Sequence, residues 1–113
     1  QGYWGAGRMI DIVYDGNYKI EIAGHANSGE MGKDLICSAA SILTVTLDKL
    51  YAKLESLDML ESRTSIIEPG FARVSCKPKE CYRGGVRLQT LAICEGYQIL
   101  AEEEPEHVQY KTA

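Results

Sequence analysis

The sequence predicts a small α+β domain in which two helices pack on a mixed or antiparallel sheet. The chain has 113 residues, about the size of one domain. Apolar residues alternate with polar ones in several short runs, which is the spacing of strands. Two longer segments instead repeat apolar residues every three or four positions, as amphipathic helices do. We therefore expect the order strand, strand, helix, strand, strand, helix, strand in a single domain.

The first two predicted strands form a hairpin. Apolar residues alternate at 10, 12 and 14 and again at 18, 20 and 22. Asp15-Gly16-Asn17 lies between the two runs and has the composition of a tight turn. The second strand should end at Gly24-His25.

A loop and a long helix are expected next. Residues 26–33 contain Gly29 and Gly32 and have no apolar period, so they predict a loop. Asp34 is a good N-cap residue and opens a helix to about residue 55. The apolar stripe of this helix consists of Ile36, Ala40, Leu43, Leu47, Leu50 and Leu54.

The second half of the chain repeats this order. Short strands are expected at 64–67 and 71–76, joined by Glu68-Pro69-Gly70. Residues 87–104 have a helical pattern that Pro105 stops, and residues 108–111 predict an edge strand. On this second helix the expected buried side consists of Leu88, Leu91, Ala92, Ile99 and Leu100.

Composition narrows the function and the compartment. A net charge of −4 and a pI near 5.1 argue against direct binding of nucleic acid. No apolar run approaches the roughly 20 residues of a membrane span, and no segment has the order of a signal peptide. We expect a cytoplasmic protein with four reduced cysteines. Residues 1–8 are Gly-rich and aperiodic, so we interpret them as an added leader and residues 9–113 as the domain.

Cys37 and His25 are the candidate catalytic pair. Cys37 follows Asp34 by three positions, which predicts a thiol in the first helical turn, where free N–H groups stabilise a thiolate. It also starts a polar line along the helix, beside the apolar stripe. His25 ends a strand on the other side of the glycine loop, within reach of a helix start. From its position alone, Cys37 could equally well be an inert thiol in the core. For His25 alone, an ordinary loop residue that bonds to the backbone is the favoured interpretation.

The segment around this pair resembles a known family. Gly24-His25-Ala26, then Gly32, then Asp34-Leu35-Ile36-Cys37 followed by small residues is similar to the signature of the ribosomal-processing cysteine protease (Prp) family. The resemblance implies an endopeptidase with His25 and Cys37 as its dyad and Asp34 and Ser41 as supporting residues.

The resemblance also implies a substrate and an assembly. The expected partner is the N-terminal extension of ribosomal protein L-twenty-seven, held by a loop containing Gly24, Gly29 and Gly32 and cleaved after an aromatic residue in an apolar pocket. The expected assembly is a homodimer. We expect no cofactor, no metal and no membrane partner.

Two other functions remain open at this stage. The first is a non-enzymatic ribosome-assembly or peptide-binding module that holds its partner in the glycine loop. The second is a zinc site built from His25, Cys37, Cys76 and Cys81, although the last two have a spacing outside the usual zinc motifs. Core packing explains Cys76 and Cys94 better, and Gly96 predicts a close approach to the sheet or to a second subunit.

Overall fold

The computed structural model describes residues 9–24 and 31–113, and within residues 31–35 only the backbone. In chain order the elements are β1 (Ile10–Tyr14), β2 (Ile20–Ala23), α1 (Met31–Ser56), β3 (Leu60–Glu68), β4 (Phe71–Pro78), a 3-10 helix (Glu80–Tyr82), α2 (Arg83–Glu103) and β5 (Val108–Thr112). His25, Gly29 and the proposed leader lie outside the described residues.

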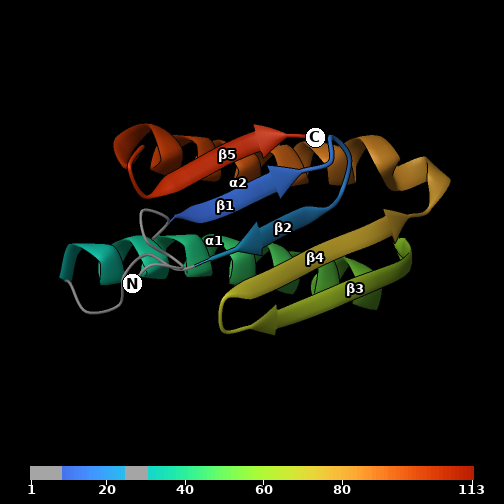
Figure 1. Ribbon diagram of the computed structural model, residues 1–113. Coiled ribbons are helices and arrows are strands. Elements are labelled where there is room, and N and C mark those ends of the chain that lie inside the picture. The colour runs from blue at the N-terminus through green and yellow to red at the C-terminus, as the bar shows by residue number, and fades with distance from the viewer. Residues whose placement is uncertain (1–8, 25–30) are drawn as a thin grey trace.

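The strands form one mixed sheet with the helices on one face (Figure 1). The order is β3-β4-β2-β1-β5, in which only β1 and β5 pair in parallel. Helix α1 packs against β3 and β4, and α2 packs against β5. The predicted fold class and element order are confirmed. Neither described helix is both long and apolar enough to cross a membrane.

The first hairpin has the turn that the sequence predicts. The Asp15 carboxylate accepts hydrogen bonds from the backbone N–H groups of Asn17 at 2.8 Å and Lys19 at 3.1 Å. Gly16 has a φ of +89°, a conformation that favours glycine. This turn brings Ile12 opposite Ile22, so the apolar residues of both strands face the helices.

Helix α1 has the predicted stripe but starts earlier than expected. It begins at Met31, so Gly32 belongs to the helix and Asp34 is not its N-cap. One glycine costs a helix only about 1 kcal/mol, too little to end a helix that is anchored by a long buried stripe. Tyr51, absent from the predicted stripe, is fully buried at 0% exposure.

The predicted buried face of α2 is wrong in part. Leu91 and Leu100 pack against the core as expected, but Leu88 and Ile99 are 70% and 56% exposed. The fully buried residues of α2 are Val86, Thr90, Cys94 and Tyr97. Thr90 and Tyr97 are polar, so a prediction based on the spacing of apolar residues did not include them. Inside the core their hydroxyls are paired: Thr90 lies 2.7 Å from the Tyr51 hydroxyl, and Tyr97 lies 2.7 Å from the Thr44 hydroxyl. These hydrogen bonds offset the free-energy cost of removing the hydroxyl groups from water.

Gly96 marks a close approach, but to α1 rather than to the sheet. A Cβ atom at Gly96 would lie 2.6 Å from Leu43 Cδ2. The two helices therefore approach as closely as they do because this position has no side chain.

We expect Gly96→Leu to destabilise the protein by about 1–3 kcal/mol, because overpacking forces the helices apart. Thermal and urea unfolding measure the change. In a Leu43→Ala background the same substitution should cost much less, since the space is vacated. Equal losses in both backgrounds would show that contact with Leu43 is not the cause.

Candidate active site

Cys37 lies on α1 at the margin of the core. It is half-buried and packs against the buried cluster. The helix start at Met31 places it in the second turn, not in the first. Free N–H groups occur only in the first turn, and the dipole effect fades beyond it. The structure therefore does not support the predicted stabilisation of a Cys37 thiolate by the end of the helix.

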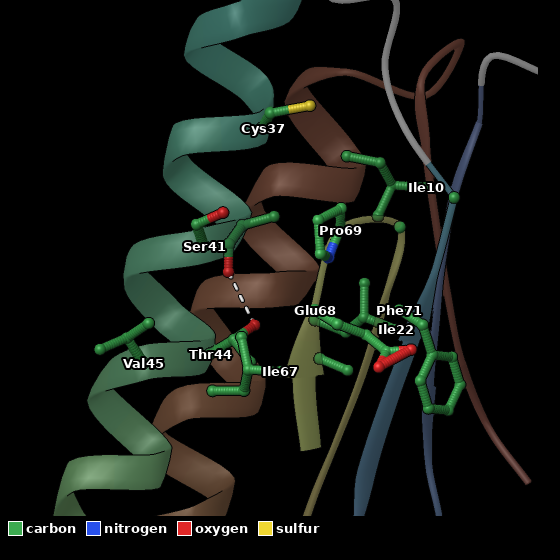
Figure 2. A pocket seen from close by; sticks show the side chains of 14 residues that line it. Ile10, Ile22, Cys37, Ser41, Thr44, Val45, Ile67, Glu68, Pro69 and Phe71 are labelled. Atoms are coloured by element: carbon green, nitrogen blue, oxygen red, sulfur yellow. Dashed lines mark hydrogen bonds between the residues drawn. The ribbon is translucent and has the colours of Figure 1, made fainter. Parts of the chain in front are cut away.

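A cavity of about 260 Å³ opens beside Cys37. Figure 2 shows it between α1 and the turn that joins β3 to β4. Its walls come from α1, from the β1 and β2 ends and from the hairpin tip: Ile10, Ile22, Gly24, Cys37, Ala40, Ser41, Thr44, Val45, Ile67, Glu68, Pro69, Gly70, Phe71 and Ala72. The lining is mostly apolar, so the cavity suits a hydrophobic group.

Ser41 and Thr44 continue along the wall from Cys37. Residues four and seven positions apart share one side of a helix, and all three side chains line the cavity. Thr44 is buried, and its hydroxyl donates a 2.8 Å hydrogen bond to the Ala40 carbonyl. Ser41 is exposed. The predicted polar line of Cys37, Ser41, Thr44, Asp48 and Glu55 thus borders the cavity at its Cys37 end, but Thr44 lies in the core and not beside it.

Gly24 connects the opposite wall to the strand before His25. It has a φ of +109°, and its N–H donates a 2.9 Å hydrogen bond to the Gly70 carbonyl. This bond ties the end of β2 to the β3–β4 turn, where Gly70 has a φ of +82°. The residue directly before His25 in the chain therefore lines the same cavity as Cys37. His25, Gly29 and the Asp34 side chain lie outside the description.

The structure separates the cysteines of the proposed zinc site. The Cys76 thiol lies beside the Tyr51 hydroxyl, and Tyr51 lies about 21 Å along α1 from Cys37. Ligands of one zinc ion all lie within about 2.3 Å of the metal, so Cys37 and Cys76 cannot share it. Among the described residues no group of three His, Cys, Asp or Glu side chains is arranged to hold a metal.

The cysteines also differ in their surroundings. Burial raises the pKa of the Cys76 thiol to about 11 and also raises the pKa of the Cys94 thiol. Cys94 is only 2% exposed, as its predicted packing role requires. Cys81 is exposed, on the 3-10 helix outside the cavity.

In a Cys81→Ser background, iodoacetamide at pH 7.5 should label Cys37 well before Cys76 and Cys94. The thiolate is the reactive form, and a pKa near 11 leaves Cys76 roughly 100-fold less thiolate than an ordinary thiol at this pH. Raising the pH to 9.5, still below that pKa, should accelerate Cys76 labelling about 100-fold. Peptide mapping after brief exposure measures the order. Early labelling of Cys76 would contradict its burial.

The sequence did not reveal the hairpin wall of the cavity. The Glu68-Pro69-Gly70 turn is recognisable, but its place over Cys37 depends on β4 inserting between β3 and β2. The signal available in the sequence was the apolar pair Ile66-Ile67 directly before the turn.

Comparison with known proteins identifies the family. The family model described as cysteine protease Prp matches residues 9–109. The crystal structure of SMU.848 from Streptococcus mutans is 30% identical, with a TM-score of 0.70, and covers 96% of this chain and 97% of that one. No curated protein matches the chain.

Two structures of the ribosomal processing protease Prp from S. aureus share the fold. One contains a substrate peptide and the other a covalently linked product peptide. Both are 20% identical and cover 93% of this chain and 98% of that one, with TM-scores of 0.56 and 0.57. The match to the cysteine protease Prp family model selects a protease over a non-enzymatic module. With a cysteine beside an apolar cavity and a family match from residue 9 to residue 109, the chain belongs to the cysteine protease Prp family.

Proposed function

We propose that the protein is a cysteine endopeptidase that removes the N-terminal extension of ribosomal protein L-twenty-seven with a dyad of Cys37 and His25. The observation that carries the proposal is the cavity, which Cys37 shares with Gly24, the neighbour of His25. The family match and the ribosomal processing activity of the S. aureus relative support it.

The proposed reaction has two steps. The Cys37 thiolate attacks a substrate carbonyl, and the tetrahedral intermediate collapses to a thioester while the His25 imidazolium protonates the leaving amine. His25 then takes a proton from water as the water attacks the thioester, which releases the carboxylic acid and regenerates the thiol. The neighbouring Ser41 hydroxyl and Asp34 have supporting roles in this scheme.

The cavity suits the expected aromatic residue before the cut. A cavity of about 150 Å³ between apolar side chains is enough for a benzene ring, and this one measures about 260 Å³. It therefore has room for one aromatic side chain and part of its backbone.

Incubation with the purified L-twenty-seven precursor from the same genome tests the proposal. We expect one cleavage, after an aromatic residue, that mass spectrometry locates at the end of the extension. Protein treated with iodoacetamide serves as the control and should be inactive. Persistent absence of cleavage with active thiol present would refute the substrate assignment.

We further propose a cytoplasmic homodimer. Cys76, Cys81 and Cys94 form no disulfide, which suits a reducing compartment. The outer sides of α1 and α2 expose Ile42 at 63% and Ile99 at 56%, around a groove that also includes Ala39 and Gly96. Apolar surface of this kind is typical of a subunit interface. Sedimentation of the purified protein measures its mass.

A further inference from the structure

The edge strand β3 differs from the other edge of the sheet. Strand β5 is short and carries Lys111, features that discourage pairing with another chain. Strand β3 is longer, and its irregularity lies at the far end, between Leu60 and Ser62. Near the cavity its residues 64–67 are uncharged, and Ile66 and Ile67 are 36% and 47% exposed. Between Arg63 and Glu68, this stretch of the edge has no charge, Pro or bulge that would discourage an added strand.

The ladder shows which backbone groups face outward. The hydrogen bond from Gly24 to Gly70 makes them a bonded pair, and such pairs recur at every second residue. Ala72 and Val74 therefore direct their backbone groups to β2, in register with Ile22 and Ile20.

The alternate residues of β4, Arg73 and Ser75, must then direct their backbone groups to β3. Ala72 and Val74 lie opposite Ile67 and Ser65, so these two β3 residues form non-bonded pairs with β4. Their N–H and C=O groups point to the free edge among the described strands. Arg63, two residues further along, has the same orientation.

Side chains at these positions face α1. Ala72 and Val74 are buried beneath the helices, and residues directly opposite in a ladder share a face. Ile67 accordingly lines the Cys37 cavity. Arg63 reaches across to Asp48 at 3.2 Å and Glu55 at 3.0 Å, which closes the far end of the space between α1 and β3.

We propose that the substrate docks as an extended sixth strand on the free edge of β3, bonded to the backbones of Ile67 and Ser65. The proposal rests on the proposed function and adds how the peptide is held. Cys37, Val45 and Ile67 of β3 line the same cavity. Its α1 wall from Cys37 to Val45 is about 12 Å long, and an extended chain covers this distance in three to four residues. A peptide with its scissile carbonyl at Cys37 thus reaches β3 three or four residues away.

Strand pairing of this kind selects a substrate by its extended backbone and by which side chains occupy every second position. Backbone bonds hold an extended segment without Pro at the bonded positions, and every second side chain turns toward α1. The substrate class is an extended, unfolded segment with apolar residues at alternate positions near the cut. A folded loop or a helix cannot offer these bonds.

An N-methyl scan of the substrate tests the proposal on the unaltered protein. The probe is a ten-residue peptide spanning the cleavage site of the L-twenty-seven precursor, methylated at one backbone nitrogen at a time. Methylation removes a donor and places a methyl group against β3, so KM should rise about tenfold or more at alternate residues. At the residues between, KM should change less than about threefold.

The matched protein variants are Ser65→Pro and Ser65→Ala. Proline removes an N–H that faces outward, which edge strands tolerate, so the melting temperature and iodoacetamide labelling of Cys37 should be unchanged. KM for the unmethylated peptide should rise about tenfold for Ser65→Pro and stay unchanged for Ser65→Ala. If Ser65→Pro fails to fold, the N-methyl scan decides alone.

The outcomes separate this inference from the proposed function. Cleavage of the unmethylated peptide with uniform tolerance of N-methyl groups would overturn the edge docking and leave the protease assignment standing. Absence of cleavage by the unaltered protein would overturn the substrate assignment and the docking together. A shift from dimer to monomer on Ser65→Pro, measured by sedimentation, would assign the edge to a second copy and also overturn it.

Discussion

Replacing Cys37 with alanine is expected to lower peptide turnover by on the order of 10⁴-fold or more, as removal of a nucleophile does in hydrolases. Serine at the same position should be equally inactive, because a hydroxyl is a far weaker nucleophile than a thiolate at neutral pH. The fold should survive both changes, since Cys37 is only half-buried at the margin of the core. Turnover and thermal melting, measured on the same samples, check the two expectations.

Cys81→Ser is the matched control for this substitution. Cys81 is exposed on the 3-10 helix and does not line the cavity, so its replacement should leave turnover unchanged. Full turnover by Cys37→Ala would exclude Cys37 as the nucleophile. A collapsed melting transition would favour a structural role in the core instead.

Replacing His25 with alanine should lower turnover by about 10²–10⁴-fold, the range that general acid–base catalysis contributes. Iodoacetamide labelling of Cys37 near neutral pH should slow as well, because an imidazolium neighbour favours the reactive thiolate. The second readout separates a base that acts on Cys37 from a residue that only shapes the loop. Peptide turnover is measured in a discontinuous assay, and the rate of Cys37 labelling is measured by peptide mapping.

The chain offers a matched histidine for comparison. It contains 2 histidines, and His107 precedes β5 and is not part of the cavity lining. Its buried Nδ1 has no hydrogen-bond partner in the described part of the chain, so His107→Ala breaks no bond there and should leave turnover unchanged. Equal losses for both variants would count against a specific role for His25.

Local patterns predicted the elements well where neighbouring residues decide the structure. The alternation in β1 and β2 and the turn at Asp15 follow from side-chain geometry within a few residues. The apolar stripe of α1 is likewise a local pattern, because the residues on one side of the helix pack into the core. These features depend on periods of two and 3.6 residues, which are visible in any short window.

The failures occurred where burial depends on a distant partner. Thr90 and Tyr97 are inside because hydroxyls on α1 accept or donate hydrogen bonds to them. Leu88 is exposed because α2 turns the side that carries Thr90 and Tyr97 to the core, and Leu88 lies away from that side. The start of α1 moved from Asp34 to Met31 because a capping preference of about 1 kcal/mol is weak against the continuing helix.

By itself the sequence determined the order of the elements, the turn chemistry and a signature around Cys37 that identifies a protease family. Only the tertiary structure decided that β4 lies between β3 and β2, which brings Ile67 and Gly70 to Cys37 and leaves β3 at an edge. The reason is physical: periodicity records which face of an element is buried, whereas strand order depends on pairing between residues far apart in the chain. Cys37, the proposed nucleophile, could therefore be recognised from the sequence, whereas the cavity beside it could not.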